Sequence, residues 1–189
     1  MSQISQWQEA LVQLDHEVRR EFEPLSEKQF AWRPAPGSWS IGECLEHLGL
    51  TTSLLLTKLK PALVEARQDG RVGSPPFRFG LVGGWFVKSM QPVQPGKRRG
   101  MPSPANFRPH GSVPKAQVLA RFKDARADFG ATLESAQGLA LDRIRAASSA
   151  KGGGWLKLNA AAWFAGTVAH LQRHVAQAKR VKQAPGFPR

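Results

Sequence analysis

Two histidines near the end of the chain carry the clearest chemical signal in the sequence. His170 and His174 lie four residues apart in the alanine-rich stretch 158–182, which has no proline and a single glycine. Alanine is the best helix former, and residues four apart on a helix share one face about one turn from each other. Two imidazoles placed in this way could bind one divalent metal ion. The pair alone does not establish such a site, because His-x-x-x-His is short and half-buried histidines more often serve packing.

A third histidine, His47, lies far upstream in a segment that also predicts a helix. Ser40 and Glu43 have the spacing of a capping box, in which each side chain accepts a hydrogen bond from the other residue's backbone amide. This box predicts a helix over residues 40–67. We assign Glu43 to the cap and Cys44 to the apolar face, so His47, on the flank of that face, is the candidate third ligand.

The rest of the chain predicts the helices that must position these residues. Apolar residues recur at threes and fours over residues 3–23, and a similar seam follows Pro114 and ends at Gly138. A short helix is expected around residues 81–90. With the two helices that carry the histidines, this gives four substantial helices and no strand, which predicts an all-α four-helix bundle.

The long connection between the second and third helices decides whether the histidines can meet. Residues 69–113 hold eight Gly, seven Pro, seven Lys or Arg and one acid. His47 lies near the start of its helix, whereas His170 and His174 lie near the end of theirs, so those two helices must run antiparallel. A short loop makes the last two helices antiparallel, and the long crossover lets the second and third run parallel. The predicted order is therefore up-down-down-up.

Three imidazoles are a ligand set that suits Zn²⁺, and also Ni²⁺ or Fe²⁺. Three protein ligands leave an open position for water or substrate, which is typical of a catalytic zinc site. The metal could acidify a bound water molecule or bind a substrate thiolate directly. The catalytic residues remain unassigned, because Asp15, Glu17 and Glu46 are all candidates for a general base and the sequence does not choose among them.

Composition limits the partners and the compartment. The chain has 27 Lys and Arg against 14 Asp and Glu, a net charge of +13, with its densest basic cluster at residues 97–99. We interpret this as a generally basic surface, since no aromatic residues are interleaved in the pattern of an RNA-binding sheet. The single cysteine, Cys44, excludes an internal disulfide and suits a reducing compartment. No signal peptide or membrane span is recognised, so we expect a cytoplasmic protein without a membrane partner.

Two segments resemble the signatures of the DinB superfamily, which includes DNA-damage-inducible and YfiT-like metalloenzymes. The first segment is LSEKQFAWRPAPGSWSIGECLEHL, and the second is NAAAWFAGTVAHLQRHVAQAKRV. The segment MPSPANFRP also resembles the crossover of the family. Four polar residues of the second signature are in place, namely His170, Arg173, His174 and Gln177.

The resemblance implies an up-down-down-up bundle, a metal site formed by His47, His170 and His174, and a homodimer. We therefore expect residues 1–189 to form one DinB-like domain, with Zn or Ni as its metal and Fe as an alternative. Characterised members include thiol-dependent S-transferases and isomerases. We therefore expect a metal-dependent enzyme, either a thiol-dependent S-transferase or a hydrolase, that acts on a small molecule such as a low-molecular-weight thiol. The alternatives are a non-catalytic metal-binding bundle and a nucleic-acid-binding protein that uses the basic crossover. A salt-dependent affinity for DNA would favour the last.

Overall fold

The computed structural model describes residues 1–93 and 103–189. In these residues the chain forms six α-helices, one 3-10 helix and two short strands. The helices are α1 (Gln3–Phe22), α2 (Glu27–Ala31), α3 (Ile41–Gln68), α4 (Gly80–Met90), α5 (Lys115–Ser135) and α6 (Ala160–Lys182), with the 3-10 helix η1 (Ala105–Phe107) and the strands β1 (Arg145–Ala147) and β2 (Lys157–Asn159). The all-α prediction is confirmed for the described residues, whereas the up-down-down-up order stays a prediction. The basic cluster at 97–99 lies outside the described residues.

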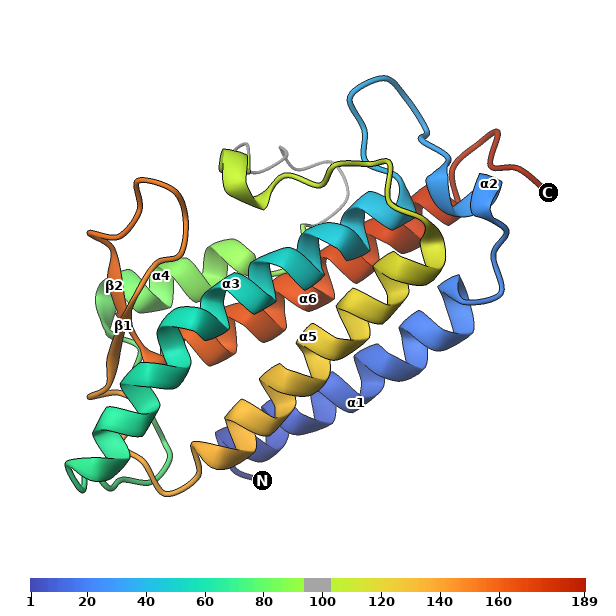
Figure 1. Cartoon of the computed structure of the whole chain (residues 1–189). Helices are drawn as coiled ribbons and strands as arrows, with labels where there is room; N and C mark the ends of the chain where they lie inside the picture. Colours follow the sequence, from blue (N-terminus) through green and yellow to red (C-terminus); the bar gives the residue numbers. More distant parts are fainter. Residues whose placement is uncertain (94–102) are drawn as a thin grey trace.

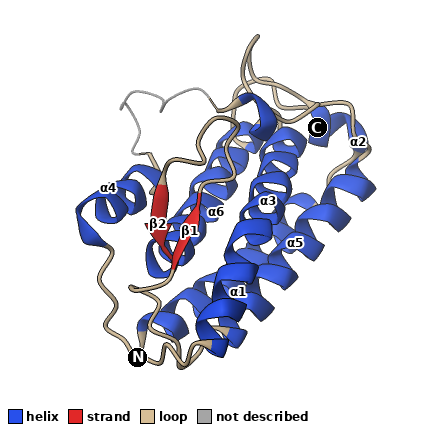
Figure 2. Cartoon of the chain, turned by 60° about the vertical axis from the view of Figure 1, so that its left-hand side comes forward, coloured by secondary structure: helices blue, strands red, loops and turns tan. Residues whose placement is uncertain are grey.

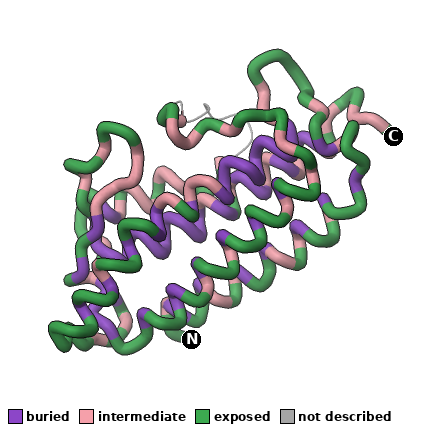
Figure 3. Tube along the Cα trace, in the orientation of Figure 1, coloured by how far each residue is buried: buried purple, intermediate pink, exposed green. Residues whose placement is uncertain are grey.

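The four long helices α1, α3, α5 and α6 lie side by side (Figure 1). Helix α3 packs on both α5 and α6, and α1 packs on the same two helices. Two uninterrupted runs of buried residues, 40–49 at the start of α3 and 158–169 leading into α6, belong to the buried interior that Figure 3 draws in purple. His47 lies inside the first run and His170 directly follows the second, so both histidines lie next to core residues.

The predicted capping box at the start of α3 is confirmed. The Ser40 hydroxyl accepts a hydrogen bond from the Glu43 amide at 3.1 Å, and Glu43 Oε2 accepts one from the Ser40 amide at 2.8 Å. Arg33 adds a two-pronged ion pair to the same carboxylate, with N–O distances of 2.8 and 2.7 Å. Because both members of the box are buried, the cap fixes the register of α3 and hence the position of His47.

Replacing Ser40 by alanine should lower the free energy of unfolding by about 1–2 kcal/mol, since the buried Glu43 amide loses its acceptor. The urea midpoint is the measurement. Ser26→Ala is the matched control, because Ser26 forms the same kind of box at the start of the short, more exposed helix α2, and we expect a smaller loss there. A Ser40→Ala midpoint equal to that of the wild type would contradict the prediction.

Helix α2 lies between α1 and α3, in a segment for which no helix was predicted. Its start carries a capping box of its own, formed by Ser26 and Gln29. The sequence contains that signal, since Ser-x-x-Gln is a recognised variant of the box. Phe30 on this helix is buried and contacts α3 at Gly42, where an added Cβ would lie 2.8 Å from the Phe30 ring.

The expectation of no strand was wrong. Strands β1 and β2 pair antiparallel, with Ala146 opposite Leu158, and they lie beside α4 in Figure 2. The polar, glycine-rich residues 148–156 connect the two strands. Each strand has only three residues, too few for a period of two to be recognised in the sequence. The sheet is tied to α6 because the Trp163 indole donates to the Ala146 carbonyl at 2.9 Å.

Helix α4 confirms the short helix expected within the crossover, and it packs along α6. Phe86 meets Trp163 edge to face, with ring centroids 5.0 Å apart, and its ring occupies the space where a side chain at Gly166 would stand. On the other side α4 leaves Leu81 and Trp85 exposed, at 95% and 63%. None of the described helices combines the length and the apolar character that a membrane span requires.

Candidate metal centre

The structure brings together all three histidines that the sequence singled out. Helix α3 supplies His47, and α6 supplies His170 and His174 from successive turns. One ring nitrogen of each lies within 4.8 Å of those of the other two. The three imidazole centroids are 4.6 to 5.0 Å apart, with the rings steeply inclined to one another. Such an arrangement points several lone pairs at one small volume.

The orientation of His47 is fixed by the crossover. Its Nδ1 lies 2.6 Å from the backbone carbonyl oxygen of Phe107, at the end of η1. A carbonyl oxygen can only accept, so Nδ1 carries the proton and Nε2 has the lone pair. That Nε2 faces the Nε2 of His170 at 3.1 Å. A histidine ligand whose second nitrogen donates to a carbonyl is the usual arrangement in metal sites.

The spacing and the burial of these nitrogens fit a divalent ion. Two nitrogens bound to a tetrahedral zinc ion at about 2.0–2.1 Å lie roughly 3.4 Å apart, close to the separation observed between His47 and His170. Within the described residues, His174 Nδ1 is buried without a hydrogen-bond partner, and an unpaired buried polar atom is costly. The donor set is thus chemically suited to Zn²⁺, Ni²⁺ or Fe²⁺.

Burial keeps the three imidazoles neutral. Loss of solvent lowers the pKa of His170 to about 3, helped by the neighbouring charges of His47 and Arg173. Loss of solvent is also the main cause that lowers the pKa of His174 to about 2, and the proximity of the other two histidines is a smaller cause. The pKa of His47 is lowered by burial too, although the hydrogen bond to Phe107 opposes the shift. Metal binding requires neutral imidazoles, so no proton has to be displaced near neutral pH.

An aromatic ring that the sequence analysis did not assign to the site covers one side of it. Trp39, directly before the cap of α3, lies with its ring centroid 4.8 Å from that of His47 and 5.5 Å from that of His174, and its ring is inclined by 29° to that of His174. On another side, Arg173 donates to the Ser89 carbonyl at 2.8 Å and joins α6 to the end of α4. The only sequence signal for the contact of Trp39 with the histidines was its position next to a helix cap. No sequence signal indicated the contact of the Phe107 carbonyl with His47.

None of the three carboxylates considered as a general base joins the histidine cluster. Asp15 pairs with Arg126, and Glu17 lies 3.5 Å from Lys179. Glu46, although adjacent to His47 in sequence, accepts hydrogen bonds from the backbone of residues 110–111. The catalytic residues therefore remain unassigned.

Comparison with known proteins identifies one family. A family model described as the DinB superfamily matches residues 10–178, most of the chain. The match includes both helices that carry the three histidines. Searches of curated proteins and of solved structures return no significant match.

Proposed function

Because the chain belongs to the DinB superfamily, we propose that it is a metal-dependent protein with His47, His170 and His174 as the ligands. The observation that carries this proposal is the convergence of three imidazoles from two helices, with those of His47 and His174 buried and that of His170 half-buried. The low pKa values of His170 and His174 support it, since both rings are ready to bind a cation without first losing a proton.

We further propose that residues 1–189 form one domain with the up-down-down-up order. In Figure 1, α3 and α5 begin at the end of the bundle where α1 and α6 finish, which supports this order. The crossover would then serve two purposes, as it returns the chain to that end and passes Phe107 over His47. We keep the cytoplasm as the proposed compartment, because the single cysteine, Cys44, is buried without a disulfide.

The proposed activity is that of an S-transferase or hydrolase acting on a small molecule, such as a low-molecular-weight thiol. Zn²⁺ or Ni²⁺ is the favoured metal, with Fe²⁺ as an alternative. When bound, the metal would supply Lewis acidity, either to a water molecule or to a substrate sulfur. The chain's own part is to present three lone pairs, to hold the His47 tautomer through Phe107, and to shield the rings from water with Trp39.

Metal analysis of the protein purified without chelator is the first test. About one equivalent of divalent metal per chain is the expected result, and screening the metal-loaded protein with thiols and electrophiles then tests the activity. Protein that takes up no zinc or nickel on titration would contradict the metal proposal. Metal without an exchangeable water would favour the non-catalytic alternative.

Nucleic-acid binding stays the second candidate because of the charge distribution. Residues 70–123 contain no Asp or Glu, and neither does the chain after Asp142. A partner with many phosphates would suit such segments, and its affinity would fall steeply with salt. Titration with duplex DNA at two salt concentrations separates the two candidates. A nucleic-acid-binding protein should bind DNA with an affinity that falls with salt, whereas the metal-dependent enzyme need not bind DNA.

A homodimer is proposed through the outer face of α4. Leu81, Val82 and Trp85 are exposed on a helix whose opposite face packs on α6, and clustered exposed apolar residues often mark an interface. The double change Leu81→Ser and Trp85→Ser should convert the dimer to a monomer in sedimentation velocity. Val64→Ser on α3, also an exposed apolar position, is the control and should leave the dimer intact. A double variant that still sediments as a dimer would place the interface elsewhere.

A further inference from the structure

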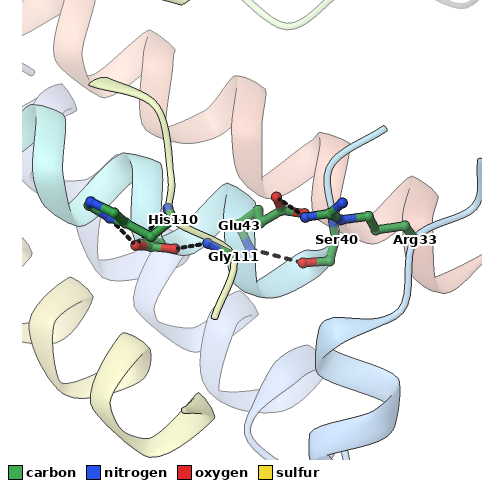
Figure 4. A network of polar contacts seen from close by, with 6 residues as sticks. Arg33, Ser40, Glu43, His110 and Gly111 are labelled. Atoms are coloured by element: carbon green, nitrogen blue, oxygen red, sulfur yellow. Dashed lines mark hydrogen bonds and ion pairs between the residues drawn. The ribbon is translucent and has the colours of Figure 1, made fainter. Parts of the chain in front are cut away.

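A short strap, residues 107–111, crosses the start of α3, and one buried carboxylate holds it there. Glu46 Oε1 accepts a hydrogen bond from the His110 amide at 3.0 Å and lies 3.1 Å from His110 Nδ1. Glu46 Oε2 accepts from the Gly111 amide at 3.2 Å. Glu46 is 8% exposed, whereas the His110 side chain is 77% exposed. Glu46 therefore holds the backbone of the strap as well as the exposed His110 ring (Figure 4).

The end of the strap is seated against the cap of the same helix. Gly111 has φ +74°, and a Cβ there would lie 2.9 Å from Arg33 Nη2 and 3.1 Å from Glu43 Oε1. Figure 4 shows Gly111 between His110 and the Arg33–Glu43 ion pair. Glycine suits this position, because the backbone is left-handed and a Cβ would crowd the neighbouring ion pair.

The other end of the strap reaches the histidine cluster. Phe107, four residues before Gly111, accepts the hydrogen bond from His47 Nδ1 at 2.6 Å. Glu46 and His47 are neighbours on α3, so consecutive residues bind the two ends of the strap. Both oxygens of Glu46 are used in this way, which argues against its service as a general base.

We infer that Glu46 is a positioning residue of the metal site. By holding the amides of residues 110–111, it keeps the Phe107 carbonyl on His47 and so fixes the tautomer whose Nε2 has the lone pair. This inference rests on the proposed metal function. A merely structural role for Glu46 would leave the His47 tautomer unchanged. The inference instead makes that tautomer depend on Glu46, although Glu46 contacts none of the three histidines.

Glu46→Ala is the principal test, with Glu46→Gln as a milder variant that keeps one acceptor oxygen. Loss of an outer partner of a ligating histidine typically weakens metal binding by about 10–100-fold, and we expect Glu46→Ala to weaken zinc binding by at least about tenfold. Zinc affinity is measured by competition with a chromophoric chelator at fixed pH. Nitrogen-15 NMR of the histidine rings in the zinc-free protein reports the tautomer directly, and His47 should change from one tautomer to a mixture.

Two controls match the two parts of the strap. Glu27→Gln removes a carboxylate that also accepts from a backbone amide, that of Lys115 at the start of α5 at 3.1 Å, but Glu27 lies away from His47 in the chain. Gly37→Ala matches Gly111→Ala, because Gly37 has the same φ of +74° but nothing within 4 Å of an added Cβ. We expect Gly111→Ala to weaken zinc binding in the same way as Glu46→Ala, and both controls to leave it unchanged.

The outcomes separate the inference from the proposed function. Wild-type protein that binds no zinc would remove the function, and the ring tautomer would still show whether Glu46 controls His47. If the wild type binds zinc and Glu46→Ala retains both the affinity and the single tautomer, the inference is wrong and the function stands. Should Glu46→Ala not fold, Glu46→Gln and Gly111→Ala decide by the same two measurements.

Discussion

Replacing His170 or His174 by alanine should remove most of the bound divalent metal while the helix content stays unchanged. Each residue supplies one of three proposed ligands. Its replacement should therefore weaken metal binding by more than the roughly 10–100-fold that is typical when a hydrogen-bond partner of a ligand is removed. The fold should survive, because α6 is anchored by a long run of buried residues that precedes the histidines. Metal per chain by mass spectrometry and helix content by circular dichroism are the two measurements.

His16→Ala is the control for these variants, since His16 is exposed on α1 and is not part of the cluster. It should bind metal as the wild type does. Retention of stoichiometric metal by either variant would remove that residue from the ligand set. Global unfolding on addition of a chelator would show instead that the metal is required for folding.

The metal-free protein should lose stability steeply as the pH falls below about 6.5. In the folded state the pKa of His170 is about 3 and that of His174 about 2, against an ordinary value of 6.5. Between these values the unfolded chain binds more protons than the folded chain, so acid favours unfolding. Each such histidine contributes a slope of up to about 1.4 kcal/mol per pH unit. The stability is therefore fully present above about pH 6.5 and decreases toward pH 3.

Urea midpoints measured on metal-free protein at several pH values in this window test the prediction. In the double variant His170→Ala, His174→Ala the urea midpoint should depend less steeply on pH, because the two imidazoles that bind protons on unfolding are gone. His16→Ala should follow the wild type. Equal slopes in the wild type and the double variant would mean that the two rings are solvated in the folded protein. Zinc-loaded protein should show an added loss on acidification, since protons compete with the metal for the same nitrogens.

Local signals explain what the sequence could predict. The box formed by Ser40 and Glu43 involves residues three apart, and the facing of His170 and His174 follows from helix geometry alone. The approach of His47 to this pair needed one further argument, that a long crossover lets α3 and α6 run in opposite directions. That argument used loop lengths rather than contacts, and it placed His47 where the structure has it.

The residues that surround the cluster could not be predicted in this way. The contact from Phe107 is made by a backbone carbonyl, which every residue possesses, so no side-chain pattern marks it. From the sequence, Trp39 could equally be an apolar residue that packs at the start of a helix or a residue that packs against two imidazoles. Glu46 was considered as a base, yet its partners lie 64 and 65 residues away in the chain, and only the tertiary fold brings them together.

The distance along the chain between the histidines determines when the site can exist. His47 and His170 are 123 residues apart, and a ribosome adding about 5–20 residues per second needs roughly 6 to 25 seconds to cover that interval. Throughout this time the nascent chain holds His47 without His170 and His174. Helix α6 is made after the other described helices, and it packs against α1, α3 and α4. Metal could therefore bind at the proposed site only after α6 has been synthesised, and a chain that stops before α6 would lack two of the three proposed ligands.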